Sequence, residues 1–196
     1  MGENSLTNVV SAKLPTKYGN FALRLFSDQN GREIIKAIIK EPLNLNQPVL
    51  VRLHSECFTG DVLGSLRCDC GEQLANALEA INASTGVVLY LPQEGRGIGL
   101  VNKLKAYNLQ DEGYDTVQAN EQLGFAPDLR HYDSASVALA LLGIKEVNLL
   151  TNNPDKIEQL IANGINVTAR TPLIVGKNET NEKYFQAKKD KMGHLL

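Results

Sequence analysis

The sequence contains no low-complexity segment, no long run of one charge and no internal repeat. No stretch approaches the roughly 18 consecutive apolar residues of a membrane span, so we expect no membrane partner. Residues 1–11 lack a basic segment followed by an apolar run, and we therefore expect no signal peptide. These absences favour a globular, cytoplasmic protein.

An excess of positive charge is also absent, because the formal net charge is −2. A broadly basic, aromatic surface is therefore not expected, and neither is a nucleic-acid partner. A local anion pocket is still compatible with a net negative charge. The chain has 196 residues, of which 43% are hydrophobic, and can bury a full core. We expect a flexible N-terminus at 1–12 and a single domain over 13–196.

Short apolar runs alternate with segments of helical periodicity, which predicts an α/β fold. A hairpin is expected over 21–40, around turn residues 28–31. The first fifty residues are rich in strands, so the predicted architecture is a layered single domain with a mixed β-sheet flanked by helices. Residues 114–132 are predicted to form an irregular loop. Further strands are predicted at 49–53, 87–91, 147–150 and 165–169, and helices at 71–85, 100–110, 134–142, 154–164 and 181–192.

Cysteine is scarce, and all three cysteines lie close together in the sequence: Cys57, Cys68 and Cys70. An odd number cannot pair fully within the chain, which fits a reducing compartment. Cys68 and Cys70 are two residues apart, so an extended segment directs their sulfurs to the same side. Three such ligands leave one position of a tetrahedral zinc for water, whose pKa zinc lowers to about 7. The pattern therefore favours a catalytic zinc.

Two other interpretations of the cysteines stay open. They are buried or adventitious thiols, or they form a structural Cys3His site with His54, three residues before Cys57. The polar residues around them are more typical of a hydrated site than of a sealed one.

Two further segments have residues suited to binding anions. The glycine-rich run 93–99 stands between a predicted strand and a predicted helix, where backbone N–H groups and Arg96 can bind phosphate, although an ordinary turn explains it equally well. Thr151 and Lys156 flank another strand-to-helix junction, which is also explained by helix capping. The pair Asp128 and Arg130, taken alone, is typical of a solvated surface pair.

These segments, with the last six residues, resemble the GTP cyclohydrolase II family, zinc enzymes that open the guanine ring at the start of riboflavin biosynthesis. The resemblance extends from about Lys13 to the C-terminus. It rests on the segments Arg52–Asp61, Ser65–Gly71, Gln93–Leu100, Leu149–Pro154 and Lys191–Leu196.

The resemblance implies a hydrolase that converts GTP and water to formate, pyrophosphate and 2,5-diamino-6-ribosylamino-4(3H)-pyrimidinone 5′-phosphate. It implies one Zn²⁺ per subunit, held by the three cysteines and water, and Mg²⁺ bound with the GTP triphosphate. A cytoplasmic homodimer is expected from the same likeness.

The resemblance also assigns roles to single residues. Asp128 matches the family's proton acceptor, Arg130 its nucleophile and Tyr107 an active-site tyrosine. Glu94 is in addition a candidate for guanine recognition, since a carboxylate can accept from N1–H and the exocyclic amine. The positions that match GTP contacts are Arg52, Leu53, His54, Ser55, Glu56, Gln73, Glu94, Gly95, Arg96, Thr116, Thr151 and Lys156.

The role of Arg130 stays open between two alternatives. A protonated guanidinium has no free lone pair, which from first principles favours a clamp on the α-phosphate. The family likeness instead implies attack on the α-phosphorus, with Asp128 as the base. His131 stands where an acidic residue often follows in the family, and this difference concerns only the electrostatics near Arg130.

Other functions compete with ring opening of GTP. A related enzyme would open a different nucleotide or release pyrophosphate without opening the ring. A structural zinc module would hold its metal with four protein ligands and bind a partner.

Overall fold

The computed structural model describes residues 6–195, apart from the side chains of Glu33, Ile34, Lys183 and Met192. The chain divides into two compact units. Unit 1 comprises Met1–His54, Ala75–Pro92 and His131–Leu173, and unit 2 comprises Ser55–Leu74, Gln93–Arg130 and Ile174–Leu196. Each unit is assembled from three separate segments, so neither is a continuous piece of sequence. The boundaries expected for the flexible N-terminus and the domain, 1–12 and 13–196, stay predictions.

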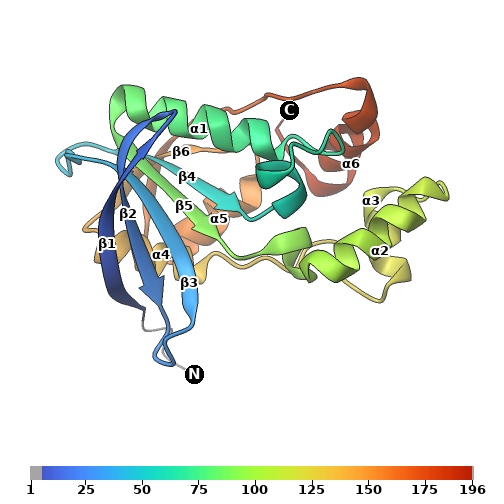
Figure 1. The fold of residues 1–196 in the computed structure, drawn as a ribbon, viewed down its shortest axis with the longest axis horizontal. Coiled ribbons are helices and arrows are strands. Elements are labelled where there is room, and N and C mark those ends of the chain that lie inside the picture. Colours follow the sequence, from blue (N-terminus) through green and yellow to red (C-terminus); the bar gives the residue numbers. More distant parts are fainter. Residues whose placement is uncertain (1–5, 196) are drawn as a thin grey trace. The chain divides into compact units, whose positions relative to one another are not determined.

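Unit 1 is built on a mixed β-sheet with strand order β1-β2-β3-β5-β4-β6-β7 (Figure 1). The pairs β1–β2, β2–β3 and β3–β5 are antiparallel, whereas β4–β6 and β6–β7 are parallel. The predicted mixed sheet is thereby confirmed. Its strands are β1 (Thr7–Thr16), β2 (Gly19–Ser27), β3 (Glu33–Lys40), β4 (Val49–Ser55), β5 (Gly86–Leu91), β6 (Glu146–Leu150) and β7 (Asn166–Thr171).

The predicted hairpin is β2 and β3, and its turn follows from two residues. The Asp28 carboxylate accepts from the backbone N–H groups of Asn30 and Arg32, both at 2.9 Å, and Gly31 takes a φ of +75°. Such an aspartate turn closed by a left-handed glycine is locally encoded. Strand β1 was not among the expected elements. It lies at the edge of the sheet and includes Thr7–Ala12, whose side chains are exposed.

The core of unit 1 lies on one face of this sheet. Alternate residues such as Val51, Leu53 and Leu89 form a cluster with Leu139 of α4 (Asp133–Leu141) and Leu160 of α5 (Pro154–Ala162). Because side chains alternate along a strand, Arg52 and His54 of β4 point to the opposite face. Helix α1 (Cys70–Ser84) runs along the strands on that other side in Figure 1, and its Ala77 and Ile81 are buried.

Unit 2 is made of helices and short helical turns. Its elements are η1 (Phe58–Val62), the first turn of α1, η2 (Glu94–Gly97), α2 (Gly99–Asp111), α3 (Thr116–Gln122), η3 (Glu179–Asn181) and α6 (Glu182–Met192). The helices expected at 71–85, 100–110, 134–142, 154–164 and 181–192 correspond to α1, α2, α4, α5 and α6. Over the described part of the chain, no helix is both long and apolar enough to cross a membrane.

Helix α3 corrects the expectation of an irregular loop over 114–132. The Asp115 carboxylate accepts from the N–H groups of Val117 and Gln118, and the Gln118 side chain accepts from the Asp115 N–H. This reciprocal cap satisfies N–H groups that the first helical turn leaves without partners. The helix is therefore encoded by Asp115 and Gln118, three residues apart.

The core assignment predicts the effect of shortening a leucine of α4. Leu139 is 0% exposed and packs in the core, so Leu139→Ala is expected to lower the free energy of unfolding by about 2–5 kcal/mol. Leu141 on the same helix is 50% exposed, and Leu141→Ala should change it by no more than about 0.5 kcal/mol. Urea denaturation measures both. Equal losses in the two variants would contradict this placement of the core.

Candidate active site

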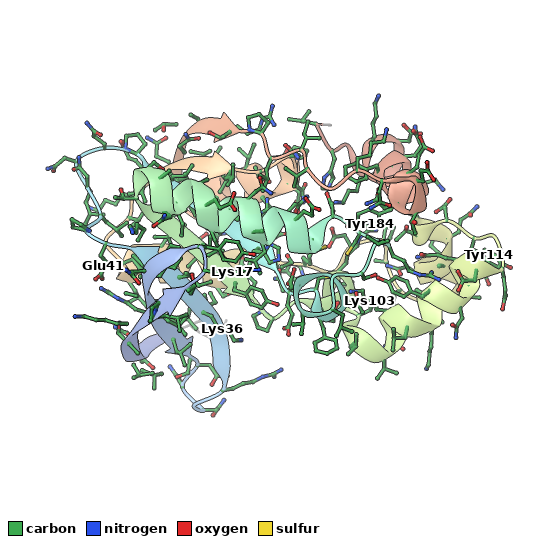
Figure 2. All side chains as sticks on the ribbon, turned by 45° about the horizontal axis from the view of Figure 1, so that its top comes forward. Lys17, Lys36, Glu41, Lys103, Tyr114 and Tyr184 are labelled. Carbon is green, nitrogen blue, oxygen red and sulfur yellow. The ribbon has the colours of Figure 1, made fainter. Side chains whose placement is uncertain are left out.

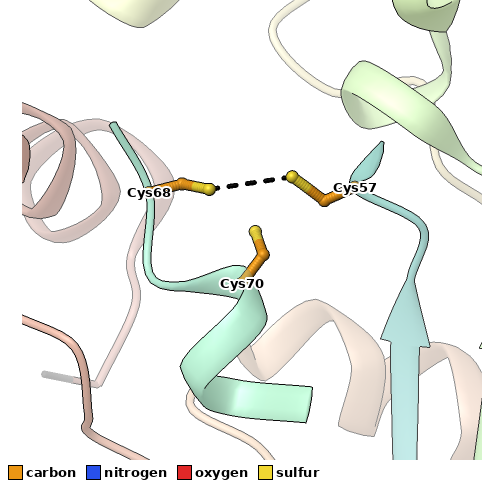
Figure 3. A group of neighbouring side chains, drawn as sticks. All are labelled: Cys57, Cys68 and Cys70. Atoms are coloured by element: carbon orange, nitrogen blue, oxygen red, sulfur yellow. Dashed lines mark hydrogen bonds between the residues drawn. The ribbon is translucent and has the colours of Figure 1, made fainter. Parts of the chain in front are cut away.

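The three cysteine sulfurs of unit 2 point toward one another (Figure 3). Cys57 follows strand β4, Cys68 lies in the next loop and Cys70 begins helix α1. All three Sγ atoms lie within 4.8 Å of one another, and those of Cys57 and Cys68 are 3.7 Å apart. Two sulfurs bound to one tetrahedral zinc at about 2.3 Å each would lie about 3.8 Å apart. The cluster therefore fits a metal ion, and no histidine belongs to it among the described residues.

Two glycines make room for this cluster. A Cβ atom on Gly60, in η1, would lie 2.8 Å from the Cys68 sulfur and 3.1 Å from the Cys57 sulfur. A Cβ on Gly71 would meet the carbonyl oxygen of Gly60. The Asp61 carboxylate also accepts from the Cys57 N–H at 3.0 Å and holds the loop that carries the first cysteine. The two glycines therefore leave room for the three sulfurs to approach one another.

The three thiols share their negative charge unequally. Hydrogen bonds from Cys68 and Cys70, with the charge of Lys103, lower the pKa of the Cys57 thiol far below its ordinary value. The hydrogen bond to Cys57 raises the pKa of Cys68 to about 11, and the pKa of Cys70 is raised as well. Without a cation the cluster thus favours one thiolate, because neighbouring like charges oppose further ionisation. A divalent cation would relieve this opposition.

Lys103 of α2 joins the cysteine cluster to Glu94. Its Nζ lies 3.0 Å from the Cys57 sulfur and 2.8 Å from Glu94 Oε1. Burial alone would lower the pKa of Lys103, but Glu94 and the Cys57 thiolate outweigh burial and raise it, so the amine is charged. Glu94 Oε2 also accepts from the N–H of Phe58 at 2.6 Å. The Glu94 carboxylate therefore connects the glycine-rich run to the loop after Cys57.

Tyr107 lies one turn after Lys103 on α2. Its hydroxyl is 3.4 Å from Thr59 Oγ1, which in turn is 3.7 Å from the Cys57 sulfur. The guanidinium of Arg67 lies 4.8 Å from the centre of its ring. Burial raises the pKa of Tyr107, so the phenol keeps its proton near neutral pH. This predicted residue therefore stands beside the cysteine cluster as a neutral donor.

Arg96 has an unusual backbone, and its two Nη atoms make no hydrogen bond within the described part of the chain. Gly95 and Arg96 both have positive φ, +62° and +61°, within η2. Left-handed backbone at a residue other than glycine is uncommon and tends to occur at functional sites. The two Nη atoms of Arg96 are buried without a hydrogen-bond partner among the described residues, and its guanidinium lies 5.8 Å from the Tyr184 ring centre. Such a group is suited to an anion.

Asp128 and Arg130 form a bidentate ion pair. Arg130 Nε donates to Asp128 Oδ1 at 2.8 Å and Nη2 to Oδ2 at 2.5 Å, while the Arg130 N–H donates to Oδ1 at 3.0 Å. The two side chains are 25% and 12% exposed, so this is not the solvated surface pair that composition suggests. Burial alone would raise the pKa of Asp128, but the hydrogen bonds and charge of Arg130 lower it. The pair is therefore ionised at neutral pH.

Ser55, Gln73 and Thr116 are further predicted site residues that belong to unit 2. Ser55 Oγ donates to Gln93 Oε1 at 3.2 Å, and Gln73 Nε2 donates to Asp69 Oδ2 at 2.6 Å. Thr116 is the first residue of α3. The predicted site residues in unit 2 are Cys57, Cys68, Cys70, Ser55, Glu56, Gln73, Glu94, Gly95, Arg96, Tyr107, Thr116, Asp128 and Arg130.

The other five predicted residues belong to unit 1: Arg52, Leu53, His54, Thr151 and Lys156. Buried Arg52 donates from Nη1 to the Leu150 carbonyl at 3.0 Å, and buried Lys156 donates to the Leu53 carbonyl at 2.7 Å. The His54 ring stacks on Tyr90 with centres 5.5 Å apart. Thr151 Oγ1 accepts from the Asn153 N–H at 3.1 Å, where α5 begins. Two cations are thereby held near the carboxyl ends of β4 and β6.

Sequence reasoning missed four residues that the structure brings to the unit 2 cluster: Asp69, Lys103, Tyr184 and Lys188. The position of Lys103 in the sequence could have indicated a role in the site, because Lys103 lies one helical turn after Gly99, at the end of the glycine-rich run. Figure 2 shows Lys103 extending from α2 and Tyr184 from α6.

Comparisons with known proteins show the family of this chain. The family model described as GTP cyclohydrolase II matches residues 7–172. GTP cyclohydrolase-2 of Shigella dysenteriae serotype 1 is 53% identical over 192 residues, which are 97% of this chain and 98% of that protein. Riboflavin biosynthesis protein RibBA of Endomicrobium trichonymphae is 53% identical over 195 residues, 99% of this chain. The chain spans 48% of that RibBA and 46% of the RibBA of Chlorobium phaeovibrioides, about half the length of each.

A solved structure supports the fold alone. RibBX of A. baumannii, a two-domain 3,4-dihydroxy-2-butanone 4-phosphate synthase, aligns with a TM-score of 0.51 at 18% identity. The alignment covers 89% of this chain and 41% of that one. The family match over residues 7–172, together with 53% identity over 192 residues to a full-length relative, identifies the family. The chain belongs to the GTP cyclohydrolase II family.

Proposed function

We propose that this chain is a zinc-dependent hydrolase that opens the guanine ring of GTP and releases formate and pyrophosphate. The product would be 2,5-diamino-6-ribosylamino-4(3H)-pyrimidinone 5′-phosphate, in the first committed step of riboflavin biosynthesis. The observation that carries this proposal is the group of three sulfurs within 4.8 Å, in a chain of the GTP cyclohydrolase II family. A cytoplasmic homodimer belongs to the same proposal and rests on family likeness.

Cys57, Cys68 and Cys70 are proposed to hold one zinc ion, with water as the fourth ligand. When bound, zinc supplies Lewis-acid activation of water and of the group under attack. The chain's own contribution is electrostatic. Lys103 keeps a positive charge 3.0 Å from the Cys57 sulfur and stabilises the thiolate form that a metal requires. Tyr107, whose raised pKa keeps it protonated, is proposed to donate a proton during ring opening.

The nucleotide is proposed to bind through cations and one carboxylate. Arg96, whose two Nη atoms have no hydrogen-bond partner among the described residues, is suited to the triphosphate, which would bring Mg²⁺ with it. Glu94 is the candidate for guanine, although Lys103 and Phe58 already donate to its carboxylate. The other matched positions stay predicted GTP contacts: Arg52, Leu53, His54, Ser55, Glu56, Gln73, Gly95, Thr116, Thr151 and Lys156.

The geometry of Arg130 supports a clamp on the α-phosphate over a nucleophile. Its guanidinium is fixed by the ionised Asp128, whose lowered pKa makes it a weak base. A guanidinium that stays protonated offers no lone pair for attack on phosphorus, but its remaining N–H groups can bind phosphate oxygens. Asp128 is then proposed to orient Arg130.

The first test is incubation of the chain with GTP and Mg²⁺, with formate and pyrophosphate measured in the same samples. Both are expected to appear in equal amounts. A zinc chelator should abolish formate, because water activation depends on the metal, and added zinc should restore it. Pyrophosphate without formate would contradict ring opening. X-ray absorption showing four protein ligands and no water would favour a structural module instead.

The Cys68→Ser variant separates metal chemistry from folding. It is expected to stay folded, because the core of unit 1 does not include Cys68, yet to bind far less zinc and to lose formate release. Some nucleotide binding should persist, since Arg96 and the other cations are unchanged. Circular dichroism, zinc content and nucleotide affinity measure these properties. Loss of the folded state on metal removal from the unmodified chain would contradict a catalytic assignment.

Arg130→Lys tests the bidentate clamp, and a search for a covalent adduct tests the nucleophile. Lysine keeps the charge but cannot form the bidentate pair with Asp128, so we expect pyrophosphate release to slow by about 10²-fold or more. Intact-protein mass spectrometry of the unmodified chain and of Cys68→Ser, quenched while pyrophosphate is being released, should show no nucleotide adduct. An adduct mapped to Arg130 would overturn the clamp.

A further inference from the structure

The C-terminal segment Ile174–Leu195 belongs to unit 2 but lies beyond residues 7–172, the region that the family model matches. No role was assigned to its side chains by the sequence motifs. Helix α6 nevertheless directs buried Lys188 and Phe185 into unit 2, together with Tyr184. The segment therefore has contacts that a merely peripheral tail would lack.

The central contact is an ion pair between Lys188 and Asp69. Lys188 Nζ donates to Asp69 Oδ1 at 2.8 Å, and the two side chains are 9% and 1% exposed. Asp69 stands between two cysteines of the cluster, Cys68 and Cys70. Its second oxygen accepts from Gln73 Nε2 at 2.6 Å, so both carboxylate oxygens are occupied. The residue between two ligands is thus fixed from two directions.

The pair depends strongly on both partners because it is buried. A charged group in a low-dielectric interior is costly to leave alone, so removing one partner of such a pair strongly destabilises its surroundings. An Asp69 carboxylate without Lys188 would therefore move toward water. That movement would displace the backbone on which Cys68 and Cys70 stand.

One close approach holds the same segment against the cysteine loop, and another contact connects it to Arg96. A Cβ atom on Gly176 would lie 3.3 Å from the Asp69 Cα and 3.2 Å from the Glu72 Cβ, so the chain passes very close there. Buried Asn181 donates to the Gly176 carbonyl at 2.7 Å and fixes that approach. The ring of Tyr184 lies 4.2 Å from Lys188 Nζ and 5.8 Å from the Arg96 guanidinium.

We infer that Lys188 is a positioning residue for the metal: through Asp69 it holds Cys68 and Cys70 in the arrangement that binds zinc. This inference rests on the proposed zinc site. Residues that orient metal ligands from behind typically change metal affinity or activity by about 10–100-fold when they are replaced. The C-terminal helix thereby completes a site whose ligands all lie within residues 57–70.

The test compares Lys188→Met with Lys189→Met in the full chain. Lys189 is the next residue of α6 and is exposed, so it is matched in composition and helix position. Zinc affinity, measured by competition with a chromophoric chelator, should fall about 10–100-fold in Lys188→Met and stay unchanged in Lys189→Met. With Co²⁺ as the probe, the absorption bands should shift only in Lys188→Met, because they report ligand geometry. Unchanged affinity and unchanged bands would overturn the inference.

A conservative variant and a double variant cover the case in which Lys188→Met does not fold. Lys188→Arg keeps the charge and should bind zinc within about threefold of the unmodified chain. Asp69→Asn/Lys188→Met removes both charges and should fold, yet bind zinc no more tightly than Asp69→Asn alone, because the two residues act through one contact. Additive losses in the double variant, or zinc affinity equal to that of the unmodified chain, would refute the route through Asp69.

The outcomes also separate this inference from the proposed function. If the unmodified chain binds no zinc, the zinc site itself fails. If it binds zinc and Lys188→Met binds equally well, the zinc site stands and the role of Lys188 is wrong.

Discussion

Repulsion among three sulfurs is the constraint around which unit 2 is organised. Atoms of Cys57, Cys68 and Cys70 that lie within 4.8 Å cannot all carry negative charge unless positive charge is placed among or beside them. The protein supplies part of that charge through Lys103, 3.0 Å from the Cys57 sulfur. A bound cation would supply the remainder, and for this reason the cluster fits a metal site better than a group of packed thiols.

A second layer of charge surrounds the first. Glu94 pairs with Lys103, and Asp69 pairs with Lys188, so two carboxylates near the cysteines each have a lysine from a helix. These pairs tie the glycine-rich run and α6 to the loops that carry the sulfurs. Arg96 differs from both lysines, because its charged end has no hydrogen-bonded partner within the described residues. The contrast between paired and unpaired cations distinguishes groups that maintain the site from a group suited to a ligand.

Local signals in the sequence predicted much of the fold and part of the site. The hairpin over 21–40 depends on Asp28 and Gly31, and the cysteine cluster depends on Cys68 and Cys70 lying two residues apart. The helix α3 was equally local, with Asp115 and Gln118 as its cap, and it was missed because the stretch looks polar throughout. The surface pair suggested by Asp128 and Arg130 proved partly buried, since burial depends on what covers the loop.

The contacts of Lys188 could not be predicted from sequence in the same way. Lys188 and Asp69 are 119 residues apart, and nothing in a lysine-rich C-terminal helix distinguishes one lysine from its neighbours. Lys188 differs from the neighbouring lysines because it is buried. It becomes buried only when the C-terminal segment packs within unit 2. Lys103 was easier to predict, because it follows the glycine-rich run by one turn of α2. Its partner Cys57 nevertheless lies 46 residues away in the sequence.

Gly60 has a consequence for how sequences of this kind can change over time. Its missing side chain leaves the space in which three sulfurs approach one another, so even a single added carbon would compete with them for that space. A related sequence that kept the three cysteines but carried another residue at this position would have to move the sulfurs apart, and would lose the room for an ion before it lost any ligand. The ability to bind a metal here would thus depend on a residue that contributes no ligand of its own.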